Sequence, residues 1–204
     1  MRDGGFVLDE RTIKQYDDFA STYVAEWTHQ TPVVVRQLVS KWFTHGSVVL
    51  DIGSGSGRDV SWLWNNGYKT QGVDASIGLL NSARLANPGV PFTQDSLPLL
   101  AKISSVSVDN VLCTAVLMHL PVGEIAPAAF NMLRVLRVGG RLICSVRPSR
   151  ESEPREADGR LYTSIEPEVI AGVFRDHGAV VLEAITSDGR RADTIWHTVV
   201  IEKS

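Results

Sequence analysis

The stretch VVLDIGSGSGRDV, residues 48–60, constrains the fold of this chain more than any other. A short hydrophobic run ends at Asp51, and glycines follow at every second position, Gly53, Gly55 and Gly57. A buried strand, a glycine turn and a helix in this order are typical of an α/β sheet. Glycine lets backbone N–H groups and the start of the next helix come close to a ligand. The stretch therefore predicts a nucleotide-type site at the end of a strand.

The spacing of the glycines indicates which ligand this is. Dinucleotide-binding turns have the pattern G-x-G-x-x-G and hold an anionic pyrophosphate at the helix start. Here the pattern is G-x-G-x-G, and the carboxylate of Asp51 precedes it, which would disfavour a pyrophosphate. A ligand with an ammonium group and a sulfonium would be favoured, and S-adenosylmethionine carries both. Ser54 lies within the turn, and Arg58 just after it either reaches the carboxylate of that ligand or faces solvent.

Two further acids follow predicted strands. Asp74 comes 23 residues after the acid of the glycine turn, with Ala75 beside it. Its carboxylate can accept hydrogen bonds from ribose hydroxyls; the alternative is that it caps the helix after it. Asp95 could accept from an adenine amino group, with the backbone at Ser96 meeting the ring, or it is an ordinary loop acid.

Short β-branched runs alternate with helical stretches, which predicts an α/β, Rossmann-like three-layer sandwich. Parallel strands are expected at residues 48–52, 70–73, 90–93, 109–114 and 141–146. Helices after the glycine turn are expected at residues 58–66, 76–86, 122–138 and 167–177. The third of these is expected to end at the pair Gly139-Gly140. Strands at 180–185 and 195–202 are joined by a short turn, so they pair antiparallel and complete a mostly parallel seven-stranded sheet.

The length of 204 residues favours one domain, with an N-terminal helical segment, 1–46, and an α/β core, 47–204. Helical patterning before the first strand is interrupted at Pro32. We expect no signal peptide, because no apolar run follows the N-terminal charges, and no membrane span. Cys113 and Cys144 fall in apolar strands, which indicates buried packing residues and a reducing, cytoplasmic location.

Charge and histidine placement limit the partners. Twenty Lys and Arg stand against 23 Asp and Glu, giving a net charge of −3. A chain of this charge has no field that would favour nucleic acid or membranes. The five histidines are scattered, and no Cys/His pair has the spacing of metal ligands, so no metal site is expected.

Several spaced motifs in one order resemble the class I S-adenosylmethionine-dependent methyltransferases. They are the glycine turn with its leading acid, Asp74, Asp95, and the segments DNVLCTAVLMHLP and LRVGGRLICSV, together spanning residues 48–146. The final antiparallel strand pair is similar to that family's seventh strand beside its sixth. Within the family, the chain looks most like small-molecule methyltransferases of the ubiquinone-biosynthesis-like or tellurite-resistance-like kind. Val138 is a departure, because many relatives have proline before the glycine pair, and this affects the turn only.

The resemblance implies roles for further residues. Relatives hold the amino group of the cofactor with backbone carbonyls at the end of the fourth strand, here Cys113 and Thr114. The segment YDDFASTYVAEW is similar to the helix that covers cofactor and substrate, and Tyr16 and Tyr23 lie on one face of it. The alternative is that both tyrosines pack on the sheet. His119 is the candidate base or substrate contact, or else a histidine bonded to backbone at a helix start.

The acceptor is the least constrained part of the prediction. Four arginines follow the fifth strand, Arg147, Arg150, Arg155 and Arg160, and Arg190-Arg191 lie in the final turn. Both segments are expected at the edge of the sheet where ligands bind. One or two of them could pair with an anionic group on a small-molecule acceptor; the alternative is solvated charges offset by neighbouring acids. A methyltransferase acting on protein or RNA, a nicotinamide-dependent oxidoreductase and a cofactor-binding regulatory protein remain as rival functions. The oligomeric state is not predicted.

Overall fold

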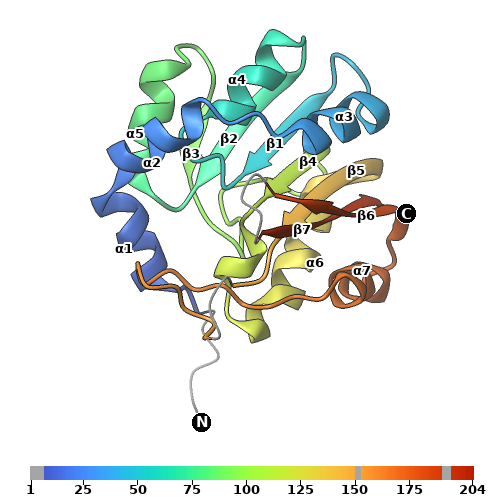
Figure 1. Cartoon of the computed structure of the whole chain (residues 1–204). Coiled ribbons are helices and arrows are strands. Elements are labelled where there is room, and N and C mark those ends of the chain that lie inside the picture. The colour runs from blue at the N-terminus through green and yellow to red at the C-terminus, as the bar shows by residue number, and fades with distance from the viewer. Residues whose placement is uncertain (1–6, 150–152, 190–193) are drawn as a thin grey trace.

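The computed structural model describes residues 7–149, 153–189 and 194–204, and within them seven strands form one sheet (Figure 1). The strands are β1 (Val48–Ile52), β2 (Lys69–Asp74), β3 (Phe92–Gln94), β4 (Val108–Thr114), β5 (Leu136–Val146), β6 (Val180–Asp188) and β7 (Ile195–Glu202). Their order across the sheet is β3-β2-β1-β4-β5-β7-β6. Strands β1 to β5 are parallel, and β7 runs antiparallel to both β5 and β6. The predicted fold class and the antiparallel strand pair are confirmed.

Helices cover both faces of the sheet, which makes three layers. They are α1 (Glu10–Asp18), α2 (Ala20–Thr28), α3 (Val33–Trp42), α4 (Arg58–Asn65), α5 (Ile77–Ala86), α6 (Ile125–Val135) and α7 (Pro167–Asp176). Figure 1 shows α3, α4 and α5 above the sheet, and α6 and α7 below it. Met132 of α6 and Phe174 of α7 are fully buried against Leu142 of β5. In the described part of the chain, no helix has the length and apolar character needed to cross a membrane.

The predicted helix at 122–138 is wrong at its end. Helix α6 stops at Val135, and β5 begins at Leu136 rather than at residue 141. Gly139 and Gly140 therefore lie inside the strand, beside a shift in the pairing of β4 with β5. A side chain at Gly140 would come within 2.7 Å of the carbonyl oxygen of Asp109. Gly140 thus allows a close approach of β5 to β4, and Gly139 supplies a φ of 72° at the irregularity, so the pair does not end a helix.

The other predicted bounds agree with the structure to within a few residues, but the N-terminal segment has a break that the sequence did not indicate. The interruption at Pro32 is confirmed, while the chain also breaks at Phe19, between α1 and α2. Asp9 begins α1 by accepting a 2.8 Å hydrogen bond from the N–H of Thr12. The two short helices lie along the edge of α5, beside the carboxyl ends of β1 and β2 (Figure 1).

Candidate cofactor and acceptor site

The glycine turn after β1 requires glycine at all three positions. Gly53, Gly55 and Gly57 have positive φ angles of 69°, 53° and 80°, which side chains rarely adopt. A side chain at Gly53 would also come within 2.2 Å of Val116. The N–H of Gly53 donates to the carbonyl of Val73 at 2.7 Å, so the turn is fixed to β2. Because these glycines carry no side chain, the backbone of the turn can approach a ligand closely.

Acidic side chains gather around this turn. Asp51 is only 2% exposed, and burial together with the nearby carboxylates of Asp59 and Asp74 raises its pKa well above the ordinary value. Arg58 lies in the same group and forms an ion pair with Asp59 at 2.6 Å. Arg58 is therefore paired rather than solvated, and its expected contact with the carboxylate of the cofactor stays a prediction. The carboxyl groups of Asp51, Asp59 and Asp74 outnumber the two arginines near them, Arg58 and Arg36, which favours a positively charged ligand.

Asp74 ties the glycine turn to the start of α5. Its two carboxylate oxygens accept from the N–H groups of Gly55 and Ser76, each at 2.8 Å. The helix cap itself is Ser76, whose hydroxyl accepts from Leu79, so the alternative role of Asp74 as a helix cap is not needed. Each oxygen of a carboxylate has a second lone pair. Asp74 can therefore still accept hydrogen bonds from the hydroxyls of a diol, with Ala75 next to it.

Asp74 also predicts how cofactor affinity depends on pH. Burial raises its pKa to about 6, Asp17 adds to this, and the N–H groups of Ser76 and Gly55 oppose it. Since only the carboxylate attracts a cationic cofactor, S-adenosylmethionine affinity should fall about tenfold between pH 7.5 and pH 5, as calorimetry would measure.

The stability of the cofactor-free protein should change in the opposite sense. A folded-state pKa above the unfolded value of 3.8 gives a stabilisation that is complete below about pH 4 and lost as the pH rises through about 6. Thermal denaturation across that range checks this, and an Asp74→Asn variant should remove both effects. Cofactor affinity that is equal at pH 7.5 and pH 5 would contradict the assignment.

Asp95 is held by its own loop. Its carboxylate accepts from the N–H of Ser96 at 2.9 Å and from the N–H of Lys102 at 2.7 Å. This is the loop-acid alternative, and it shapes the segment after β3. The proposed contacts of Asp95 and Ser96 with an adenine ring stay a prediction.

The end of β4 lies next to the glycine turn. Asp51 of β1 pairs in register with Leu112, so Cys113 and Thr114 follow at the carboxyl edge. Cys113 is buried, and a hydrogen bond with Cys144 together with burial raises its pKa, as expected for a packing residue. Ala115 then adopts a φ of 61°, a strained value for alanine that aims the next residues at the turn. The sequence contained no signal for this strain.

Helix α1 is attached to both sides of the site. Its Asp17 accepts from the hydroxyl of Ser76 at 2.6 Å and from the N–H of Gly78 at 2.9 Å, at the start of α5. On the other side, the hydroxyl of Thr12 accepts from the N–H of Leu161 at 2.8 Å. The helix therefore bridges the cofactor turn and the segment that follows β5.

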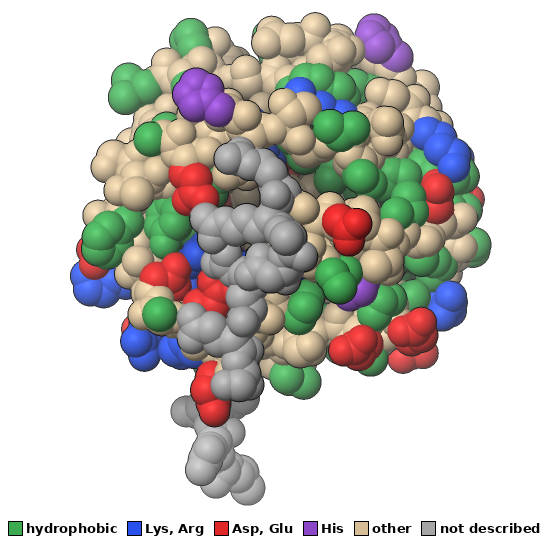
Figure 2. All heavy atoms as spheres, in the orientation of Figure 1, with side chains coloured by type: hydrophobic (Ala, Val, Ile, Leu, Met, Phe, Trp, Pro, Cys, Tyr) green, Lys and Arg blue, Asp and Glu red, His purple; other side chains and the backbone are tan. Residues whose placement is uncertain are grey.

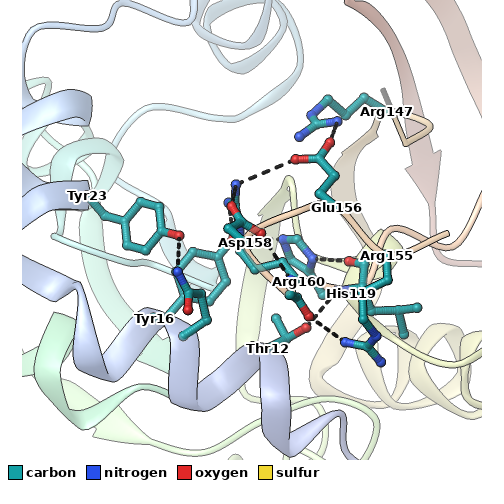
Figure 3. A network of polar contacts seen from close by, with 12 residues as sticks. Thr12, Tyr16, Tyr23, His119, Arg147, Arg155, Glu156, Asp158 and Arg160 are labelled. Carbon is teal, nitrogen blue, oxygen red and sulfur yellow. Dashed lines mark hydrogen bonds and ion pairs between the residues drawn. The ribbon is translucent and has the colours of Figure 1, made fainter. Parts of the chain in front are cut away.

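His119 lies in a chain of hydrogen bonds between these elements (Figure 3). Its Nδ1 lies 2.6 Å from the carbonyl of Leu161, and its Nε2 lies 2.8 Å from the hydroxyl of Tyr16. The carbonyl can only accept, so we assign the proton to Nδ1, and Tyr16 donates to Nε2. Arg160 donates to the same tyrosine oxygen at 3.0 Å. Burial lowers the pKa of His119 to about 4, and Arg160 and Arg147 add to this, so the ring is neutral at pH 7.

Aromatic rings extend from the glycine turn to the segment after β5. Trp27 stacks on Tyr23 with ring centroids 5.1 Å apart, and Tyr23 packs on Tyr16 at 5.0 Å. Tyr16 contacts His119 at 5.5 Å, and His119 contacts Tyr162 at 4.7 Å. The two predicted tyrosines thus line the site and do not pack on the sheet alone. Trp27 was missed, although its spacing of four residues from Tyr23 continues the same helical face.

Arg147 and Arg160, which follow β5, are buried and paired with acids rather than solvated. Arg147 is 7% exposed, forms an ion pair with Glu156 at 2.8 Å and covers the ring of Tyr162 at 3.9 Å. Arg160 pairs with Asp158 at 2.7 Å, and the dashed lines of Figure 3 join these groups. The acids that the sequence supplies nearby therefore neutralise the arginines inside the protein. Arg150 and Arg190-Arg191, which the sequence also suggested, lie outside the described residues.

The pairing of Arg147 predicts a structural role for it. Replacing Arg147 with methionine leaves the buried carboxylate of Glu156 without its nearest cation, which should lower the free energy of unfolding by about 2–4 kcal/mol. Urea denaturation measures this, and Arg175→Met on the exposed side of α7 is the matched control. Unchanged stability with weaker acceptor binding would instead support the hypothesis that Arg147 binds an anionic acceptor.

The residues around the glycine turn fit a cationic nucleoside. The turn has room only for glycine, and the buried hydroxyl of Ser54 has no hydrogen-bond partner among the described residues. Asp74 can accept further hydrogen bonds, and the carboxyl groups of Asp51 and Asp59 lie in the same group. A pyrophosphate would meet these acids unfavourably. These carboxylates, the hydroxyl and the glycine backbone thus match the ligand that the glycine spacing predicts.

Comparison with known proteins assigns the family. Residues 50–144 match the family described as "Methyltransferase domain". "Putative methyltransferase ECU09_1500" of Encephalitozoon cuniculi (strain GB-M1) is 31% identical over 155 residues, covering 73% of this chain and 68% of that protein. The chain belongs to the class I S-adenosylmethionine-dependent methyltransferases.

Solved structures show the same fold. The 1,6-didemethyltoxoflavin-N1-methyltransferase of Burkholderia thailandensis, with bound 1,6-didemethyltoxoflavin and S-adenosylhomocysteine, has a TM-score of 0.75 at 21% identity, covering 99% of this chain and 93% of that one. Magnesium protoporphyrin IX methyltransferase of Synechocystis PCC 6803, with bound S-adenosylmethionine, has a TM-score of 0.70 at 24% identity, covering 97% and 99%.

Proposed function

We propose that this chain transfers a methyl group from S-adenosylmethionine to a small-molecule acceptor, and that His119 takes the proton the acceptor loses. The observation that carries the proposal is the hydrogen-bonded chain from Arg160 through Tyr16 to His119, at the carboxyl edge of the sheet. Parallel α/β sheets bind ligands at this edge. The cofactor supplies an activated methyl group on its sulfonium, so the protein mainly aligns the reactants and manages a proton.

In this proposal, the acids and the turn hold the cofactor. Asp74 accepts from the ribose hydroxyls, and Asp95 and Ser96 lie toward the adenine. Asp51, the glycine turn, Arg58 and the backbone at Cys113 and Thr114 surround the amino-acid part. Methyl transfer releases S-adenosylhomocysteine. The helices α1 and α2 cover the site, with Tyr16 and Tyr23 facing it.

In this proposal, His119 accepts the acceptor's proton indirectly, by way of the hydroxyl of Tyr16, as the methyl group is transferred. The tyrosine oxygen takes the acceptor's proton while its own proton moves to Nε2 of His119, and the electron pair of the broken bond stays on the acceptor. A base whose pKa is about 4 is sufficient, because an oxygen or nitrogen that gains a methyl group becomes strongly acidic. Arg160 can only donate, so it keeps the hydroxyl proton of Tyr16 directed at the imidazole.

The charges around the hydrogen bonds of Tyr16 and His119 favour an uncharged acceptor over an anionic one, because Arg147 and Arg160 are already paired with acids. Figure 2 shows Lys and Arg side chains interspersed with Asp and Glu on the described part of this face. Such a mixed surface does not favour a polyanion. Methyl transfer to a protein or RNA stays the alternative.

Labelled methyl transfer tests the proposal. The chain is incubated with methyl-tritiated S-adenosylmethionine and a cell extract, and the label is followed in fractions separated by size. We expect label in the small-molecule fraction, and His119→Asn should reduce its rate of appearance by about 100-fold, the usual scale of general-base catalysis. Label in the protein or RNA fraction alone would favour the alternative.

A matched histidine serves as the control. His177→Asn changes an exposed imidazole beyond the end of α7 and should leave the rate unchanged. If His119→Asn labels the acceptor as fast as the unmodified chain, His119 is not the base.

A further inference from the structure

Trp27 of α2 contacts the glycine turn directly, and neither the glycine pattern nor the hydrogen-bonded chain accounts for it. A side chain built on Gly55 would come within 3.3 Å of Cζ3 of the indole and 3.7 Å of Cε3. The N–H of the same glycine donates to the carboxylate of Asp74 at 2.8 Å. Gly55 therefore lies between a carboxylate and an aromatic ring.

The position of Trp27 is fixed by packing on both sides. Tyr23 stacks on the indole with an interplanar angle of 25°, and Tyr16 lies 5.9 Å from it. The junction of α1 and α2 is packed closely against α5, because a side chain at Gly78 would come within 3.1 Å of Ala20. The indole thus stands beside the turn because its helix is anchored there.

The carboxylate of Asp74 and the indole of Trp27 both contact Gly55, and both attract a cation bound at the turn. Aromatic rings attract cations through their quadrupole, with indole the strongest. Replacing a positive ligand by a neutral one of the same shape would lose both attractions. If the indole only excluded water from the site, the charged ligand and the neutral ligand would bind equally well.

We propose that Trp27 selects the charged cofactor over its neutral product, by attracting the sulfonium of S-adenosylmethionine at the glycine turn that Asp74 also contacts. This inference rests on the proposed function. Methyl transfer converts the sulfonium to an uncharged thioether, so the attraction ends when the reaction does. Trp27 thereby increases the affinity for S-adenosylmethionine but not for S-adenosylhomocysteine. This difference favours the exchange of the product for a new molecule of cofactor.

Calorimetric affinities for three ligands test the proposal without any turnover. The ligands are S-adenosylmethionine, S-adenosylhomocysteine and sinefungin, an analogue with a charged amine in place of the sulfonium. In Trp27→Leu, we expect about a tenfold loss for the two charged ligands and at most about a twofold loss for the neutral one. Trp27→Phe should keep a large part of the selectivity, because it retains an aromatic face.

The controls separate folding, function and selectivity. Trp64→Leu replaces a half-exposed tryptophan of α4 and should change no affinity. Circular dichroism establishes that each variant is folded, and if Trp27→Leu does not fold, Trp27→Phe and Trp27→His carry the comparison. Equal losses for all three ligands would overturn the inference while leaving the proposed function intact. Failure of the unmodified chain to bind S-adenosylmethionine would overturn both.

Discussion

Replacing Asp74 with alanine should reduce the affinity for S-adenosylmethionine by about 100-fold or more. The carboxylate would lose two charge-assisted hydrogen bonds to the ribose, each contributing about 1.5 kcal/mol or more. It also holds the N–H groups of Gly55 and Ser76, so the turn itself would loosen. Calorimetric titration of the two chains measures the loss.

Two further variants make this result interpretable. Asp74→Asn keeps the shape and one acceptor oxygen, and we expect a smaller loss, of about 20-fold. Asp176→Asn, an exposed acid at the end of α7, should have no effect on the affinity. An affinity in Asp74→Ala within threefold of the unmodified chain would contradict the role assigned to this carboxylate.

Replacing Gly53 with alanine should be the most destabilising single methyl addition in the site. The alanine would have to adopt the φ of 69° that Gly53 has, and its β-carbon would lie 2.2 Å from a methyl group of Val116. Backbone strain and the clash together should lower the free energy of unfolding by about 3 kcal/mol or more, and cofactor binding should be lost. Chemical denaturation and calorimetry measure the two effects.

Gly46 offers a control that separates strain from clash. Its φ of 81° is similar, but a side chain there would have nothing within 4 Å. Gly46→Ala should therefore show the strain alone, about 1 kcal/mol. In the double variant Gly53→Ala, Val116→Ala, part of the loss should be recovered. Equal stabilities of Gly46→Ala and Gly53→Ala would show that the turn tolerates a side chain.

The fold and the cofactor turn were predictable because their signals are local. Strands and helices leave a periodicity of a few residues, and the G-x-G-x-G pattern with Asp51 lies within one short segment. The strand that contains Gly139 and Gly140 was missed for the opposite reason. Gly140 allows a close approach to the backbone of Asp109 on the neighbouring strand, and no local pattern distinguishes this from a helix end.

The acceptor side could not be predicted because its partners are far apart in sequence. Tyr16 and His119 are separated by 103 residues, and Arg155 pairs with Asp9 across 146 residues. The sequence supplied the arginines and the acids of the segment after β5 but not their pairing. Only the fold determines which charges are neutralised inside the protein, and this pairing is the reason why we propose an uncharged acceptor rather than an anionic one.

Titration calorimetry with S-adenosylmethionine, S-adenosylhomocysteine and NADH tests the central claim most directly. The claim is that the acidic glycine turn after β1 holds a cationic nucleoside, not a dinucleotide. We expect one molecule of S-adenosylmethionine or S-adenosylhomocysteine to bind per chain, with the charged ligand held more tightly, and no heat of binding from NADH. Binding of NADH without binding of S-adenosylmethionine would contradict the account.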